Sequence, residues 1–140
     1  MVYALDTNII SCLLRPTRNQ DVVERFKTEI KNGNDYVIPP LSHYEILWYL
    51  LRKNASAQLS IFNDLYKNSL VKINMGETEF IKADEIRAFL EEKGKLIGNN
   101  DADIFIAAYC IINGYILVTD NIIHFEFING LKFINWKERD

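Results

Sequence analysis

The residues of this chain best suited to chemistry are four acidic side chains that lie far apart in the sequence. Asp6, Glu45, Asp103 and Asp120 each lie just after a predicted strand or in the first turn of a predicted helix. Carboxylates brought together repel one another and raise each other's pKa, which a fold tolerates if a cation lies among them. Oxygen ligands without a nearby cysteine or histidine pair suit Mg²⁺ or Mn²⁺ rather than Zn²⁺. Such a site is the usual setting for chemistry on phosphates.

The hydrophobic pattern predicts the elements that would position these acids. Short apolar runs alternate with stretches of helical periodicity, which predicts parallel strands joined by right-handed helical crossovers. The strand runs are apolar almost throughout, as expected when both faces of a sheet are covered. The sequence predicts one α/β domain over residues 1–140. Strands are expected at 2–5, 36–38, 70–73, 115–118 and, at an edge, 132–134; helices are expected at 7–14, 20–31, 42–53, 57–68, 77–93, 101–112 and 122–125.

This topology brings the acids to one edge of the sheet. Parallel strands end at a common edge, the crossover helices begin there, and ligands of open α/β sheets bind at that edge. Six polar residues are therefore expected to converge: Asp6, Glu45, Asp101, Asp103, Asp120 and Asn121.

Each acid also has an ordinary structural interpretation. Asp6 could cap the helix that follows it, and Glu45 could be the capping-box partner of Ser42. Asp101 and Asp103 could complement a helix dipole, and Asp120 could be a turn residue. The coincidence of all of them at one edge favours a metal site.

Composition limits the class of protein. With 140 residues, 49% of them hydrophobic, and a formal net charge of -3, the chain is not a strongly basic protein that coats nucleic acid. The longest apolar run, 104–112, is far short of the roughly 20 residues that span a bilayer, and the first residues do not form a secretory signal. Cys12 and Cys110 form no Cys-x-x-Cys pair, so a reducing, cytoplasmic location is expected.

Several short motifs resemble those of one family. Leu5-Asp6-Thr7-Asn8 resembles the opening motif of PIN-domain ribonucleases, and Glu45 falls at their second acidic position. Residues 103–108 resemble the third motif, and residues 117–121 with His124-Phe125 resemble the fourth. Gly130-Leu131 and Asn135-Trp136 are similar to the tail of the VapC toxins of bacterial toxin–antitoxin pairs. Residues 86–94 and 97–98 resemble the VapC branch specific for initiator tRNA.

The resemblance implies a PIN-like three-layer α/β/α sandwich with a short central parallel sheet of 4–5 strands. It also implies a Mg²⁺-dependent endoribonuclease, with Asp6 and Asp103 as the main metal ligands and Glu45 assisting by binding metal or orienting water. The fourth acidic position aligns with Asn121, one residue after Asp120, so either is a candidate. A cognate VapB-type antitoxin and a homodimer are implied as well.

Several residues near the acidic positions could support the site. Thr7 and Thr119 could position water or only hydrogen-bond their turns, and Asn8 could hold a carboxylate in place. Arg15, with Arg18, Lys93 and Lys95, could contact RNA phosphates, although a solvated surface explains any one of them equally well. His43 and His124 are expected in packing or turn roles. The aromatic set Trp48, Tyr49, Phe62 and Tyr66 is expected in the core, although some exposure there would suit an antitoxin groove.

Two other classes of function compete with the nuclease. One is a non-catalytic binding or regulatory domain of the same fold, in which the acidic edge binds metal weakly and docks a partner. The other is a phosphate-transfer enzyme of receiver or phosphatase type. A phosphatase of that kind would need a second aspartate at the position of Asn8, which counts against this alternative.

Overall fold

A computed structural model describes residues 1–96 and 101–137 of the chain. Within these residues, all strands belong to one parallel sheet with the order β2-β1-β3-β4. Tyr3 of the central strand β1 is paired with Tyr36 on one side and with Ile116 on the other. The strands are β1 (Val2–Leu5), β2 (Asp35–Val37), β3 (Ile116–Val118) and β4 (Phe133–Ile134).

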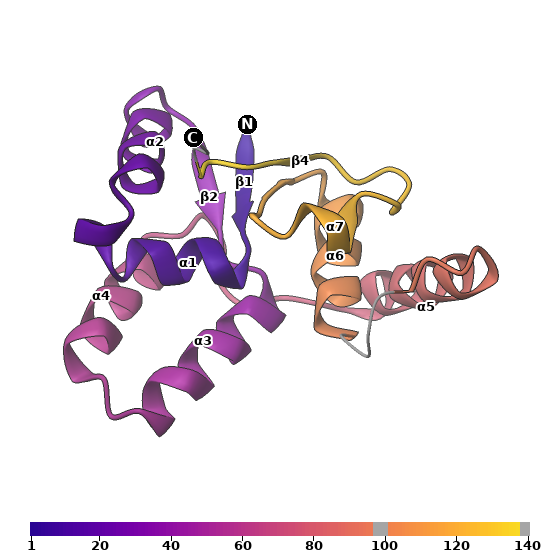
Figure 1. The fold of residues 1–140 in the computed structure, drawn as a ribbon, viewed down its shortest axis with the longest axis horizontal. Coiled ribbons are helices and arrows are strands. Elements are labelled where there is room, and N and C mark those ends of the chain that lie inside the picture. Colours follow the sequence, from indigo (N-terminus) through magenta and orange to yellow (C-terminus); the bar gives the residue numbers. More distant parts are fainter. Residues whose placement is uncertain (97–100, 138–140) are drawn as a thin grey trace.

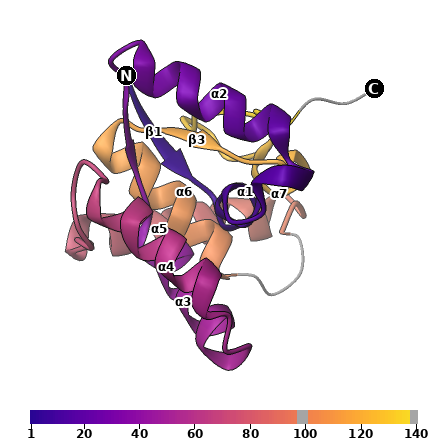
Figure 2. The ribbon, with the colours of Figure 1, turned by 90° about the vertical axis from the view of Figure 1, so that its left-hand side faces the viewer.

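Helices cover both faces of this sheet, as Figures 1 and 2 show. In Figure 2, β1 and β3 lie between α2 and α6. The expected α/β fold is confirmed. The helices are α1 (Thr7–Leu13), α2 (Gln20–Lys31), α3 (Pro40–Arg52), α4 (Ser56–Lys67), α5 (Glu77–Glu92), α6 (Asp101–Asn113) and α7 (Ile122–Phe125), with a short 3-10 turn, η1 (Pro16–Arg18), before α2.

The strands divide their side chains between two apolar clusters, because successive residues of a strand point to opposite faces. Tyr3, Leu5 and Val118 belong to a cluster with residues of α1, α2 and α3. Ala4 and Leu117 belong to the other cluster, with residues of α5 and α6. β1 and β3 are thus buried on both faces, and this packing holds their carboxyl ends side by side.

The expected strand at residues 70–73 is wrong. Leu70 donates its backbone N–H to the carbonyl of Tyr36 at 2.8 Å, but residues 70–73 form neither a strand nor a ladder with β2. Val71 packs against the core, but Leu70 and Ile73 are both exposed, so the segment lacks the apolar cover of a buried strand. Residues 97–98, which contribute to the resemblance with one VapC branch, lie outside the described residues.

Two local predictions around α3 are also wrong. The helix begins at Pro40 rather than after a cap at Ser42, and proline suits the first helical position because its missing N–H would have no partner there. Ser42 is fully buried inside the first turn, and its hydroxyl has no hydrogen-bond partner among the described residues. Trp48 and Tyr49 are exposed rather than part of the core, whereas Phe62 is buried as expected.

Candidate active site

Asp6 is the buried centre of the acidic edge. It follows β1 directly, is the N-cap of α1, and is only 2% exposed. One carboxylate oxygen accepts a hydrogen bond from the Thr7 backbone N–H at 2.8 Å, and the other accepts one from the Thr119 hydroxyl at 2.7 Å. Thr119 comes directly after β3, the neighbour of β1, so the ends of two parallel strands meet at this carboxylate.

The pKa of Asp6 is raised from 3.8 to about 6. Burial is the largest cause, because a low-dielectric environment disfavours the ionised carboxylate. The hydrogen bonds from Thr119 and Thr7 lower the pKa, and the negative charges of Asp103 and Glu45 raise it. Asp6 does cap α1, as its ordinary interpretation predicted, but it also lies within electrostatic range of two more acids.

Glu45 is oriented by the first helix and not by a capping box. The Thr7 hydroxyl donates to Glu45 Oε1 at 2.7 Å, which connects α1 to the first half of α3. The capping-box interpretation of Glu45 needed Ser42 as the N-cap, and Pro39 occupies that position instead. The bond with Thr7 places Glu45 beside the residue that follows Asp6.

Asp103 lies in the first turn of α6 and is buried. Burial raises its pKa, while a hydrogen bond and the charge of His124 act in the opposite direction. His124 Nδ1 is 2.7 Å from Asp103 Oδ2, so α7 orients this carboxylate. The sequence predicted only a packing or turn role for His124, and this contact with Asp103 was not expected. Its position in the fourth resembled motif was the signal available.

The structure places the two candidates for the fourth acidic position differently. Asp120 Oδ1 accepts a hydrogen bond from the Asn135 amide at 3.0 Å, and its other oxygen lies 3.9 Å from Lys137 Nζ. Asn8 contacts the same turn, because the Asp120 backbone N–H donates to Asn8 Oδ1 at 3.4 Å. These bonds connect Asp120 to the C-terminal segment. The backbone N–H of Asn121 donates to the Thr119 hydroxyl at 3.0 Å, which orders the turn after β3.

Asp101 and Arg15 were also predicted as site residues. Asp101, at the start of α6, forms an ion pair with Arg87 of α5, and Arg87 also pairs with Glu91 at 2.6 Å. Asp101 is exposed, so this ion pair lies on the surface, in agreement with the expectation that Asp101 could serve only the start of the helix. Arg15 lines a cavity together with Thr7 and Glu45.

The chemistry of the donors suits a hard divalent cation. Among residues 1–96 and 101–137, no group of three or more Asp, Glu, His or Cys side chains could by itself hold a metal ion. Mg²⁺ is usually bound by one or two carboxylates and keeps several waters, so it does not need such a group. Asp6 and Asp103, buried and mutually repulsive, fit that mode. In the same described ranges, no helix is long and apolar enough to cross a membrane.

The fold and this acidic edge define a class of protein. Residues 3–128 match the model of the PIN domain family, so the chain belongs to that family and the resemblance of its motifs is confirmed.

The relatives of this chain within the family are similar to it over almost their whole length. Ribonuclease VapC2 of Rickettsia felis is 29% identical over 136 residues, which cover 97% of this chain and 98% of that protein. Ribonuclease VapC2 of Haemophilus influenzae is also 29% identical, over 96% of this chain and 97% of its own length.

Solved structures show the same fold. The structure of VapBC2 from Rickettsia felis bound to a DNA fragment from their promoter superposes with a TM-score of 0.81 at 26% identity, covering 98% of this chain and all of that chain. VapBC-1 from nontypeable Haemophilus influenzae gives a TM-score of 0.78 at 24% identity, covering 97% and 98% of the two chains.

Proposed function

We propose that this PIN-domain protein is an endoribonuclease, the VapC toxin of a type II toxin–antitoxin pair, and that it requires Mg²⁺ or Mn²⁺. The observation that carries the proposal is the buried Asp6, whose pKa is raised to about 6 by burial and by the charges of Asp103 and Glu45. A domain that needed Asp6 only as a helix cap would gain nothing from placing two further acids within range of its charge. The names of the relatives support the same conclusion.

Asp6 and Asp103 would hold the cation, and Glu45 would assist. A bound divalent cation supplies two things, a lowered pKa for water and compensation of negative charge on phosphoryl oxygens. Thr119 fixes the orientation of the Asp6 carboxylate, and His124 fixes that of Asp103. Oriented ligands of this kind need less rearrangement when substrate arrives.

Glu45 is suited to orient the attacking water for in-line displacement at the phosphate. Its Oε1 accepts a hydrogen bond from the Thr7 hydroxyl. This bond fixes the orientation of the carboxylate and therefore also the position of the second oxygen. Glu45 is partly exposed and lines the neighbouring cavity, so water and substrate reach it. In this proposal, Asp120 and Asn8 shape the turn after β3 rather than contact the substrate.

The test of this proposal is cleavage of total RNA by the purified protein with and without Mg²⁺, followed by mapping of the new ends. We expect metal-dependent cleavage at a small number of sites. Initiator tRNA, the substrate suggested by the resemblance of residues 86–94, is assayed beside an elongator tRNA. Cleavage of the elongator tRNA alone would reject initiator tRNA as the substrate.

Matched variants separate this activity from a contaminating nuclease. Asp103→Asn and Asp6→Asn should abolish cleavage, whereas Asp84→Asn, at an exposed position of α5, should not. The rival function is a non-catalytic binding domain. Absence of metal-dependent cleavage of any RNA by the folded protein would favour that rival.

A second apolar cavity suits the proposed VapB-type antitoxin. It has a volume of about 610 Å³, lies between α2 and α4, and is lined by apolar residues that include the exposed Ile30 and Ile61. Structural neighbours of this chain are VapBC complexes, which supports an antitoxin segment as the occupant. Ile61→Arg should prevent co-purification with a co-expressed VapB-type antitoxin, whereas Ile81→Arg on α5 should not. The implied homodimer is tested by sedimentation of the same samples.

A further inference from the structure

A cavity of about 530 Å³ opens beside the acidic residues, between α1 and α3. Thr7 and Glu45 belong to its wall, so the cavity is continuous with the candidate active site. The volume lies within the range of about 300–1,000 Å³ that is usual for small-ligand sites. A ligand in this cavity would therefore lie next to an RNA phosphate bound at Asp6, Glu45 and Asp103.

The wall of this cavity formed by α3 is largely aromatic. Tyr44, Trp48 and Tyr49 of α3 line it, with exposed fractions of 65%, 52% and 36%. Their spacing explains the arrangement, since residues four apart share a face of a helix: Tyr44 with Trp48, and Glu45 with Tyr49. Three adjacent exposed aromatic residues are unusual on a surface without a ligand or partner.

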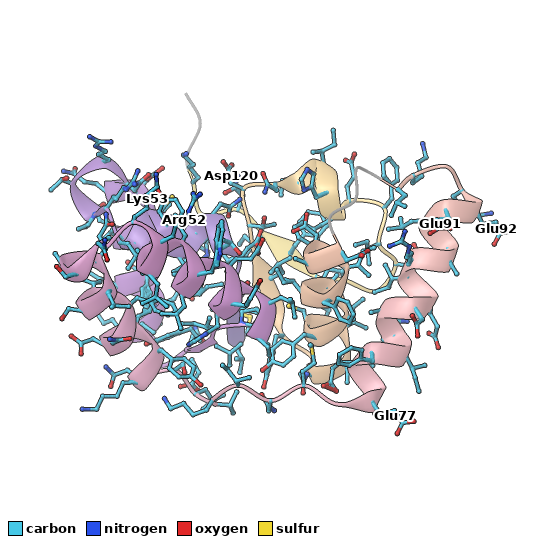
Figure 3. All side chains as sticks on the ribbon, turned by 90° about the horizontal axis from the view of Figure 1, so that it is seen from below. Arg52, Lys53, Glu77, Glu91, Glu92 and Asp120 are labelled. Atoms are coloured by element: carbon cyan, nitrogen blue, oxygen red, sulfur yellow. The ribbon has the colours of Figure 1, made fainter. Side chains whose placement is uncertain are left out.

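Two arginines lie near the aromatic wall. The Arg52 guanidinium lies 4.7 Å from the centre of the Trp48 ring, and Arg15 lines the cavity without an ion-pair partner in the described part of the chain. Figure 3 shows Arg52 and Lys53 together at one side of the molecule, while Glu77, Glu91 and Glu92 lie along α5 at the other. An anionic group is thus favoured beside Arg15 and Arg52 and disfavoured at α5, whereas the part of the cavity at Glu45 is acidic.

We infer that this cavity binds one unpaired nucleobase of RNA against Trp48, with Arg15 and Arg52 contacting the flanking phosphates. The inference rests on the proposed ribonuclease function and assigns a base-binding subsite to it. Aromatic rings bind unpaired bases by stacking, whereas the bases of a duplex are already stacked on one another. An aromatic wall with two nearby arginines fits the base and the phosphates of that ligand.

Trp48 is the best candidate in this cavity for stacking on a base. Its indole has the largest aromatic face in the cavity, and the contact with Arg52 restricts the orientations of the ring. The chain contains two tryptophans, and the other, Trp136, is only 3% exposed. Quenching of tryptophan fluorescence by a stacked base would consequently report on Trp48.

Binding is measured with a fluorescently labelled, single-stranded oligoribonucleotide in the presence of chelator, so that cleavage does not intervene. Trp48→Ala should raise the Kd roughly 5- to 150-fold, the range expected for the loss of one base stack. Trp48→Phe should retain most of the affinity and lose most of the fluorescence quenching. Leu51→Ala, at an exposed position of the same helix outside the cavity, should change neither.

Ligand variants separate stacking from phosphate contacts. An oligoribonucleotide with an abasic position at the subsite should bind wild type more weakly and should bind wild type and Trp48→Ala equally. A duplex of the same sequence should also be insensitive to Trp48→Ala. Equal Kd values of wild type and Trp48→Ala for the intact single strand would overturn the inference.

The outcomes distinguish this inference from the proposed function. RNA cleavage by wild type together with an unchanged Kd in Trp48→Ala would overturn the subsite alone. Binding that depends on Trp48 without any metal-dependent cleavage would overturn the nuclease function alone. An unchanged RNA affinity combined with lost co-purification of a VapB-type antitoxin would assign the aromatic wall to that protein and overturn the inference.

Discussion

Replacing Asp6 with asparagine should make the metal-free protein more stable at neutral pH. Asp6 is 2% exposed, and its burial together with nearby negative charges disfavours the ionised carboxylate. Asparagine has nearly the same shape and no charge. Its carbonyl oxygen can still accept the Thr7 backbone N–H, and its amide lies beside the Thr119 hydroxyl. The substitution therefore removes the unfavourable charge while it retains the cap of α1.

The expected magnitude follows from the pKa of Asp6. A rise from 3.8 to about 6 corresponds to about 3 kcal/mol of folding free energy, at about 1.4 kcal/mol for each pH unit. Because the pKa is higher in the folded state, the folded protein binds the proton more tightly than the unfolded chain. The stability that Asp6 contributes is fully present below pH 3.8 and is lost as the pH rises through about 6. Asparagine does not titrate, so the advantage of Asp6→Asn grows over the same interval.

Urea denaturation with chelator measures this difference. The free energy of unfolding of Asp6→Asn minus that of wild type should increase by about 2 kcal/mol between pH 4 and pH 8. This comparison cancels any loss from the altered bond to Thr119, because that loss is present at both pH values. Asp84→Asn, at an exposed position, is the control and should show little change.

Two results would refute this reasoning. One is a difference between Asp6→Asn and wild type that is the same at both pH values, and the other is a difference that shrinks as the pH rises.

Added Mg²⁺ should reduce the stability advantage of Asp6→Asn over wild type. At ten times its Kd, it should stabilise wild type by about 1.4 kcal/mol and should leave Asp6→Asn almost unchanged.

Three further substitutions test His124 and Thr119, which orient the acids, and Asp120, the remaining candidate acid. His124→Ala should lower the Mg²⁺ affinity or the activity by about 10- to 100-fold, because Asp103 loses its partner; an unchanged Mg²⁺ dependence of the cleavage rate would contradict this role. Thr119→Val should lower the free energy of unfolding by about 1–3 kcal/mol in urea, because buried Asp6 and a backbone N–H lose their partner; equal stability would count against it. Asp120→Asn should reduce kcat/KM by less than about tenfold, or 1.4 kcal/mol, because Asp120 bonds to the C-terminal segment; a loss as large as that of Asp103→Asn would assign Asp120 to the fourth acidic position.

Much of the fold was predictable because its elements are local patterns. The helix at residues 20–31 has the predicted bounds, and the strand runs at 2–5 and 115–118 lie within a residue of β1 and β3. The segment 70–73 was misassigned because an apolar run shows only that a strand is allowed. Whether a ladder forms depends on a partner edge and on cover from a helix. Leu70 donates one hydrogen bond to Tyr36 of β2, but Leu70 and Ile73 are exposed and lack that cover.

The convergence of Asp6, Glu45 and Asp103 was predictable from topology, whereas the bonds that orient them were not. The Thr7–Glu45 bond joins residues 38 apart, and the Thr119–Asp6 bond joins residues 113 apart. The first depends on how α1 and α3 pack against each other, and the second on the register of β1 against β3, and no local pattern encodes either. The contact between His124 and Asp103 was missed for the same reason, although both residues lie in motifs that the sequence analysis had identified.

The orientation of the acids shows why this edge depends on the whole chain. Asp6 is held by the residue that follows β3, Glu45 by the first residue of α1, and Asp103 by a residue of α7. Each carboxylate thus has at least one hydrogen-bond partner on an element other than the one that carries it. The repulsion that raises the pKa of Asp6 opposes this convergence, and the packing of β1 and β3 between two apolar clusters must outweigh it. A variant that loosens either cluster should therefore impair the acidic site before it unfolds the protein.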